Sequence, residues 1–450
     1  MSGTTEALSA PGTPGRPWVT AVRRWLLLAL TLGLAASISL SELTLVVLAA
    51  WLVFGPREAG AARAGWPLAG PFVVFAAWTL VAALAAPRLV ESLAATKGLL
   101  TLGAFYVVLH ACPSRRAAER FLTGLFIAVS VVALFSIAQV GLCPAGGAVE
   151  AGPWRLLFRK CERARGFFSI YMTLAGVLTQ VFVATLPRLA RAGWSRAWVL
   201  PLWLIGALAL GLTYVRGAWL GFALGAAGCA LALRRRLVLG VLAGVVVVAL
   251  VAEPGVLHRL RTIGDLTDDT ARDRLAMLDT GLRLARAHPI TGVGPGQVKH
   301  LYPVWASPEA LRRSTSHLHD TPLQIVVERG VPGLAAWIAI WVAFFGASLR
   351  TLSRIPAGDE DARGLVLGSM AAIAAFLVAG LFEYNFGDTE VLLVAVALMA
   401  LPFGVQRDLD EVTGHDKPRW RSEAESPGTS ARSRTFSPDR RHSTRNNRAP

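Results

Sequence analysis

The sequence predicts an all-α integral membrane protein with about 12 transmembrane helices. Hydrophobic residues make up 54% of its 450 residues and charged residues only 16%, whereas soluble domains usually carry about 25% charged residues. The mean hydropathy is +0.50, and the apolar residues come in unbroken runs such as 237–251 and 365–381. Runs of roughly 17 to 25 apolar residues suit a helix that crosses the hydrocarbon core of a bilayer.

The apolar runs define the expected spans in chain order. They lie at 24–40, 42–56, 66–86, 89–112, 118–141, 167–187, 197–214, 217–233, 237–253, 322–349, 364–383 and 388–404. The first run follows Arg23 and Arg24 and is interpreted as a retained span rather than a cleaved signal peptide. Residues 1–23 are expected to form a cytoplasmic tail and 24–404 the membrane domain. Residues 405–450, rich in Arg, Ser and Pro, are expected to form a disordered basic cytoplasmic tail.

Basic residues orient the chain. With the N-terminus in the cytoplasm, the inner loops carry Arg57, Arg63, Arg115, Arg116, Arg120, Arg188, Arg191, Arg196, Arg234, Arg235, Arg236, Arg350, Arg354 and Arg363. The outer turns at Ser41 and 383–388 carry no Lys or Arg. This pattern follows the positive-inside rule and predicts a multi-pass inner-membrane protein. Because the clusters flank spans, the net charge of +16 indicates topology rather than a nucleic-acid partner.

Two outer stretches carry cations against this bias. One is the loop 142–166, and the other is the turn 213–219 with Arg216. A cation at an outer membrane face needs a local partner. For the loop, both an anionic substrate and a carboxylate or lipid phosphate remain open, whereas a substrate is favoured for Arg216. The loop also holds Cys143 and Cys161, which form a disulfide in an oxidising compartment or stay as two thiols.

The largest outer segment, 254–321, is expected to be a periplasmic loop that contains short helices. The leucine spacing from Asp273 to His288 predicts an amphipathic helix. Gly292, Gly294 and Gly296 favour a tight turn, with a phosphate-binding loop as the alternative.

Two histidines end this segment, at the entrance to a span. A neutral imidazole such as that of His317 or His319, near the carboxylate of Asp320, can take a proton from a sugar hydroxyl at neutral pH. A metal site and a hydrogen-bonded surface pair are the alternatives. No neighbouring Cys or further His completes a metal site, so no metal and no cofactor are expected.

The order of these motifs resembles the O-antigen ligase and polymerase family of bacterial envelope glycosyltransferases. The blocks that carry the resemblance are 163–168, 213–219, Arg274 followed by 289–296, and 317–333 with its His-x-His and Glu-x-Gly-x-x-Gly patterns. Asp320 stands where the family usually has Asn, and 169–172 lacks the Pro-Asn often found there.

The resemblance implies transfer of a glycan from a polyprenyl diphosphate carrier to an acceptor hydroxyl, such as that of the lipid A core, at the periplasmic face of the bilayer. His319 is then the expected general base, or a positioning group, for the acceptor hydroxyl, and His317 or Glu328 orients it. Fixed arginines stabilise the leaving diphosphate. The expected catalytic residues are His319, Arg216, Arg274 and His317, and the expected substrate-binding residues are Arg163, Arg165, Glu328, Gly294 and Gly296.

Within the family, a ligase-like activity is favoured over a polymerase. A transporter of lipid-linked sugars is the alternative from another class, and it predicts ionisable residues along a path through the membrane. Lys97 and Glu91, in the expected span 89–112, are the residues that fit it.

Overall fold

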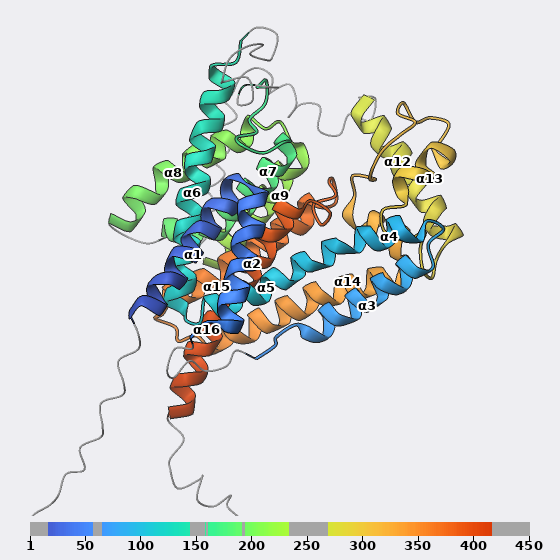
Figure 1. Cartoon of the computed structure of the whole chain (residues 1–450). Coiled ribbons are helices and arrows are strands. Elements are labelled where there is room, and N and C mark those ends of the chain that lie inside the picture. Colours follow the sequence, from blue (N-terminus) through green and yellow to red (C-terminus); the bar gives the residue numbers. More distant parts are fainter. Residues whose placement is uncertain are drawn as a thin grey trace, which may run out of the picture. The chain divides into compact units, whose positions relative to one another are not determined.

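The computed structural model of the chain describes residues 17–56, 65–144, 158, 161–190, 194–233 and 269–415 (Figure 1). Over these residues the regular structure is entirely helical. By its internal contacts the chain divides into Met1–Leu409 and a C-terminal unit, Asp410–Pro450. Only the end of the last helix is described in the second unit.

The helices follow the apolar runs of the sequence. The first half contains α1 (Pro17–Ala36), α2 (Ile38–Phe54), α3 (Ala69–Leu84), α4 (Leu89–Ala95), the 3₁₀ helix η1 (Thr96–Leu99), α5 (Leu100–Ala111) and α6 (Arg115–Gly141). The second half contains α7 (Tyr171–Thr185), the 3₁₀ helix η3 (Leu186–Ala190), α8 (Trp194–Gly211), α9 (Arg216–Leu233), α12 (Asp269–Ala287), α13 (Val298–Trp305), α14 (Thr321–Arg354), α15 (Glu360–Ala379) and α16 (Thr389–His415).

Among the described residues, 8 helices are long and apolar enough to cross a membrane, and α2, α3 and the 197–211 part of α8 are shorter apolar helices. The all-helical membrane class is therefore confirmed. The expected span 237–253 lies outside the described residues, so the count of about 12 spans stays a prediction. The first part of the expected loop 254–321 also lies outside them. Helix α16 continues past the expected end of its span at 404, so residues 405–415 are helical.

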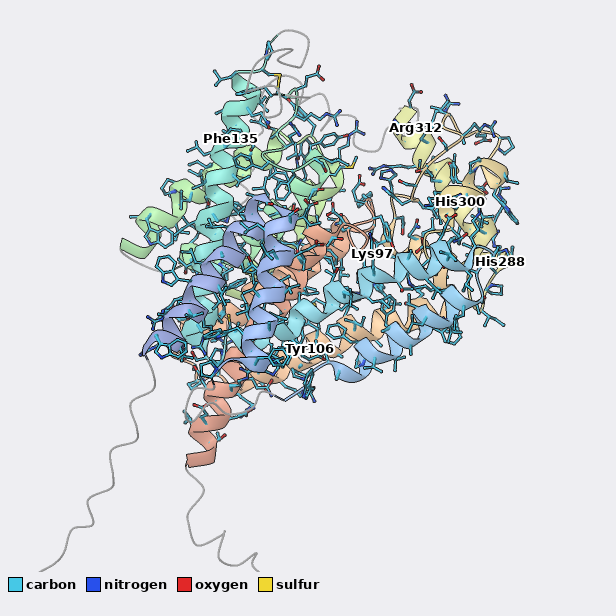
Figure 2. The ribbon with its side chains drawn as sticks, viewed as in Figure 1. Lys97, Tyr106, Phe135, His288, His300 and Arg312 are labelled. Carbon is cyan, nitrogen blue, oxygen red and sulfur yellow. A yellow bond between two sulfur atoms is a disulfide. The ribbon has the colours of Figure 1, made fainter. Side chains whose placement is uncertain are left out.

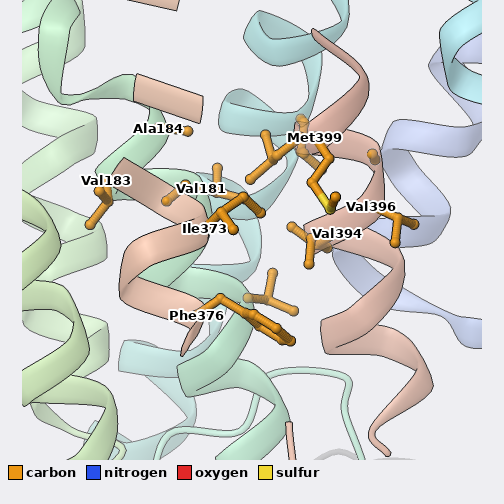
Figure 3. Packing of buried hydrophobic residues seen from close by; sticks show 14 of the residues in the cluster. Val181, Val183, Ala184, Ile373, Phe376, Val394, Val396 and Met399 are labelled. Carbon is orange, nitrogen blue, oxygen red and sulfur yellow. The ribbon is translucent and has the colours of Figure 1, made fainter. Parts of the chain in front are cut away.

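The core lies where α7, α15 and α16 meet (Figure 3). Every residue of α7 from Thr173 to Thr185 is buried. Small residues allow close approach of these helices, because an added Cβ at Gly368 would lie 2.1 Å from the carbonyl oxygen of Ala184. Valines, Ile373 and Phe376 fill the remaining space around Met399. This core fixes the helix ends that carry the site.

Helix α14 is broken near its first third. Gly330 has φ 67° and ψ −177°, and Pro332 follows within the same helix. A Cβ on residue 330 would lie 1.9 Å from the carbonyl oxygen of Ile290. Around the break, the backbone N–H groups of Val293 and Gly294 donate to the carbonyls of residues 327 and 328, at 2.9 and 3.0 Å. The glycine-rich segment 289–296 is thereby fixed to the membrane helix rather than free in the outer segment.

The outer segment is ordered where it is described. The amphipathic helix expected from Asp273 to His288 is present as α12, and Leu284 is fully buried. Leu275, Leu278 and Leu282 are instead exposed by 47, 40 and 40%. These three leucines lie on the side of α12 that faces away from the small buried cluster around Leu284.

Of the two alternatives for the outer cysteines, the structure has the disulfide. Cys143 and Cys161 are bonded, with their Cα atoms 5.5 Å apart. The bond closes the basic loop 142–166 immediately before Arg163. Cys112 and Cys229 are free and buried.

Candidate active site

A cavity of about 510 Å³ is lined by most of the charged site residues that were predicted from the sequence. We call it the first cavity. Its walls come from the loop after Cys161, the start of α9, helix α12, the start of α14 and the turn 380–388. Arg163, Arg216, Arg274 and His319, which lie far apart in the sequence, all line it. The structure therefore brings together four residues that were predicted from separate motifs.

The carboxylate of Glu383 joins two of these residues. It accepts a hydrogen bond from Nη2 of Arg274 at 2.7 Å and one from Nδ1 of His319 at 2.8 Å. Its side chain is only 9% exposed. The turn that carries it is held in place by Thr321, whose backbone N–H donates to the carbonyl of Gly380 at 2.7 Å and whose Oγ1 donates to the carbonyl of Glu383 at 2.8 Å.

The hydrogen bond to Glu383 fixes the tautomer of His319. A carboxylate only accepts, so a neutral His319 carries its proton on Nδ1 and leaves the Nε2 lone pair available. His319 has φ 52°, in the left-handed region that L-residues rarely adopt. Strain of this kind collects at functional sites, where the surrounding structure holds it. The next residue, Asp320, caps α14 by accepting from the N–H of Leu323 at 2.8 Å, a role that Asp and Asn fill equally well.

The cations of the first cavity have different partners. Arg163 lies 4.5 Å from the ring centroid of Tyr171, in a cation–π contact. Arg312 lies beside the start of α12 (Figure 2), where its Nε is 3.2 Å from Oδ2 of Asp273. Arg216 is the first residue of α9, so its charge adds to the positive end of that helix dipole. The site is thus rich in groups that attract an anion.

The ring of His317 packs against that of His319, but His317 lines a different cavity. The two ring centroids are 4.3 Å apart, and His317 lines a cavity of about 270 Å³, which we call the second cavity. Burial, together with the neighbouring His319, lowers the pKa of His317 to about 4. Its buried Nδ1 has no hydrogen-bond partner within the described part of the chain. His317 is therefore neutral near pH 7.

Glu328 lies at the second cavity too. Its carboxylate accepts from the backbone N–H of Gly296 at 2.9 Å, from Nε2 of Gln324 at 2.8 Å and from Nη1 of Arg329 at 2.8 Å. It is 3% exposed and holds the glycine-rich segment in place. Gly296 lines the second cavity, whereas Gly294 packs against Ala86 and lines neither cavity.

Arg165 lines neither cavity as well. Its Nη1 donates to the carbonyl of Phe168 at 3.1 Å, and its backbone N–H donates to Oε1 of Gln139 at 3.4 Å. These contacts fold the loop that carries Arg163. A role of Arg165 and Gly294 in substrate binding stays a prediction.

Comparison with known proteins adds to this geometry. Residues 201–338 match the family described as O-antigen ligase. A second match is the exopolysaccharide production protein ExoQ of Rhizobium meliloti (strain 1021), which is 32% identical over 162 residues, 33% of this chain and 35% of that protein. The chain thus covers about a third of the length of this relative.

The matched residues 201–338 contain Arg216, Arg274, His317 and His319, and the broken part of α14. Arg163 and Glu383 lie outside the matched residues, yet they line the same cavity. Glu383 is the site residue that the motifs did not single out. It sits in a short outer turn without basic residues, and an acidic residue there, opposite a surplus of outer arginines, is the signal that could have found it.

Proposed function

We propose that this chain is a membrane glycosyltransferase that moves a glycan from a polyprenyl diphosphate carrier to an acceptor hydroxyl. The first cavity is its proposed active site. The observation that carries the proposal is the convergence of Arg163, Arg216 and Arg274 on one cavity with the hydrogen-bonded pair His319–Glu383. These residues supply what such a transfer needs: fixed positive charge for the leaving group and a base for the acceptor.

The arginines suit a diphosphate. Its negative charge grows as the bond to the sugar breaks, and groups already held in place stabilise it without reorganisation. The planar guanidinium pairs with phosphate oxygens in a bidentate manner. Arg274 is held by Glu383, and Arg216 stands at a helix N-terminus, where anions are also favoured.

His319 suits the role of general base. The acceptor oxygen bonds to the anomeric carbon of the donor sugar while the bond from that carbon to the diphosphate oxygen breaks. The hydroxyl proton passes to Nε2 of His319, and the carboxylate of Glu383 stabilises the imidazolium that forms. The electron pair of the broken bond leaves with the diphosphate oxygen.

The rest of the first cavity suits the lipid part of the donor. Leu220, Leu275, Leu278 and Leu381 line it, and Leu275, Leu278 and Leu381 are more than a third exposed. Burial of apolar surface favours binding by about 25 cal/mol per Å². Isoprene units next to the diphosphate can cover these side chains.

The periplasm of a bacterium is the proposed side of the reaction. The positive-inside pattern supports a position of the first cavity at the outer ends of the spans. The Cys143–Cys161 disulfide, beside the same cavity, supports this placement, because disulfides persist in oxidising compartments.

The comparisons support two kinds of transfer, which differ in the acceptor. The matched family is described as O-antigen ligase, which supports a ligase, and we take lipid A core as its candidate acceptor. A polymerase that joins glycan units is the second candidate, because ExoQ is a protein of exopolysaccharide production. The transporter alternative has less support, since Glu91 pairs with Arg88 at 3.2 Å and with Lys299 at 3.7 Å on the outside of the bundle.

Transfer by the full chain in nanodiscs tests the proposal. The donor is a polyprenyl diphosphate-linked glycan, lipid A core is the acceptor, and EDTA is present. We expect transfer to survive EDTA and to fall about 10²-fold or more in His319→Ala and in Arg274→Ala. Arg286→Ala, an exposed arginine of the same helix as Arg274, is the matched control and should transfer normally. Normal transfer by folded His319→Ala would refute the proposal, and glycan growth on the carrier would select the polymerase.

A further inference from the structure

The second cavity lies against the first at the histidine pair. Helix α3, the 3₁₀ helix η1, α5, the broken α14 and the start of α16 surround it. Among its lining residues are Phe75, Thr96, Thr101, Ser316, His317 and Tyr384. Its 270 Å³ is close to the lower limit of about 300 Å³ for small-molecule pockets, so it suits one small unit of a larger ligand.

The two cavities differ in charge. The first is lined by four arginines, Arg163, Arg216, Arg274 and Arg312, and by three carboxylates, Asp273, Asp320 and Glu383, so its cations exceed its anions by one. In the second, the charged side chains are those of Glu328 and Arg329, which pair with each other at 2.8 Å. A buried pair of this kind leaves no net charge for a ligand. A diphosphate therefore fits the first cavity, and a neutral polar group fits the second.

The lining of the second cavity matches a sugar ring. Hydroxyl-bearing side chains come from Thr96, Thr101, Thr389 and Ser316, and aromatic rings come from Phe75, Phe386 and Tyr384. Sites of this kind combine apolar and aromatic walls with a few placed polar groups. A sugar has an apolar C–H face for the aromatic rings and a rim of hydroxyls for the polar groups.

The histidine pair connects the two spaces. His319 lines the first cavity, His317 lines the second, and their ring centroids are 4.3 Å apart. The buried Nδ1 of His317 has no hydrogen-bond partner in the described ranges of the chain. Displacement at an anomeric carbon needs the attacking oxygen and the leaving oxygen on opposite sides of that carbon. Cavities on two sides of the imidazole pair provide that arrangement.

We propose that the second cavity binds a neutral sugar unit of the acceptor glycan and presents its hydroxyl to the histidine pair. This inference rests on the proposed function for its chemical meaning, because the transfer step is the one described above. The binding of a sugar is argued from the second cavity alone. The acceptor is thereby defined as a glycan with an uncharged terminal sugar.

Oligosaccharide binding by the full chain in nanodiscs tests the claim. The probe is a set of short neutral oligosaccharides released by mild acid from the envelope polysaccharide of the host, with binding followed by saturation-transfer NMR. Ser316→Trp fills the mouth of the second cavity from an exposed loop position, and Ser314→Trp is the matched control in the same loop, away from both cavities. We expect wild type and Ser314→Trp to bind equally, and Ser316→Trp to have a Kd raised about tenfold or more.

Thr101→Val is a second variant, which removes a hydroxyl and keeps the shape of the side chain. It should also weaken oligosaccharide binding. Equal binding by wild type, Ser316→Trp and Thr101→Val would overturn the inference, as would absence of binding by wild type. Displacement of the oligosaccharide by undecaprenyl diphosphate would overturn it too, because the sugar would then occupy the first cavity.

Undecaprenyl diphosphate binding separates this inference from the proposed function. Arg216→Ala should lose affinity for undecaprenyl diphosphate and keep its affinity for oligosaccharide, and Ser316→Trp should show the reverse. If wild type binds oligosaccharide but not undecaprenyl diphosphate, the proposed donor fails and the sugar site stands. If it binds only the diphosphate, the sugar site fails and the donor stands.

Discussion

Glu383 accepts hydrogen bonds from both His319 and Arg274, so one substitution alters both residues. Glu383→Gln keeps the size of the side chain and removes its charge. The amide stabilises a protonated His319 less well, so we expect kcat to fall about 10²-fold. Transfer kinetics at a fixed pH measure this effect.

Two variants control this prediction. Glu383→Asp keeps the charge and should recover part of the activity. Glu309→Gln changes an exposed carboxylate of the outer segment and should behave as wild type. If Glu383→Gln lowers kcat and Glu309→Gln does so equally, the effect is not due to the pair with His319.

His317 makes stability depend on pH. Its pKa of about 4 in the folded protein lies below the value of about 6.5 for an exposed histidine. The unfolded chain therefore binds the proton first as the pH falls, and stability is complete near pH 7 and is lost between about pH 6.5 and pH 4. At pH 5 the loss amounts to about 2 kcal/mol.

His317→Gln removes this titration and should lessen the fall. The melting temperature in detergent at pH 7.5 and at pH 5 measures it. His288→Gln replaces an exposed histidine and should lose as much stability on acidification as the wild type. If the melting temperature falls equally between pH 7.5 and pH 5 in wild type and in His317→Gln, the proton responsible binds elsewhere.

Among the elements, the broken helix α14 connects the membrane core to the site. Its part after the break packs in the core. Before the break, Thr321 holds the turn 380–388, Glu328 holds the glycine-rich segment, and Gln324 accepts from the N–H of Leu318. The break at Gly330 leaves room for the carbonyl of Ile290. Without it, the segment 289–296 has no place beside the helix.

Gly330→Ala tests this element. The backbone of Gly330, with φ 67° and ψ −177°, lies in a region essentially restricted to glycine, which costs another residue about 1–3 kcal/mol. The Cβ would also lie 1.9 Å from the carbonyl oxygen of Ile290. We expect a lower melting temperature and weaker donor binding, since the segment has to move. Gly346→Ala lies in the same helix with nothing within 4 Å of its Cβ, and it should be neutral or slightly stabilising. Equal melting temperatures of the two variants would contradict the prediction.

At the scale of the whole molecule, the parts of the fold governed by hydrophobicity were predictable. The apolar runs gave the membrane class and the positions of helices such as α7 and α15, because bilayer thickness sets their length. The motifs likewise indicated Arg216, Arg274 and His319, which share the first cavity.

The features that could not be predicted from the sequence depend on contacts between distant segments. Glu383 meets His319 across 64 positions of the chain, and no local pattern encodes that pairing. The pairing of the cysteines stayed open because a sequence contains no Cα distance. The break in α14 was missed, since its apolar periodicity continues through Gly330 and only the packed segment 289–296 reveals the reason for it.

The orientation of the molecule in the membrane makes the last prediction. Arg350, Arg354 and Arg363 flank the turn between α14 and α15, and the positive-inside rule places that turn in the cytoplasm. Ser314, in the outer segment, should then face the periplasm. Both Ser314 and Ala357 are exposed, so single cysteines placed there can react with a maleimide.

The native thiols give little background to such labelling, because Cys112 and Cys229 are buried and the other pair is bonded. We expect a membrane-impermeant maleimide to label Ser314→Cys in intact spheroplasts and Ala357→Cys only after lysis. The reverse pattern would place the first cavity in the cytoplasm. An acceptor assembled outside the membrane could not then reach His319, and the disulfide beside Arg163 would lie in a reducing compartment where it does not persist.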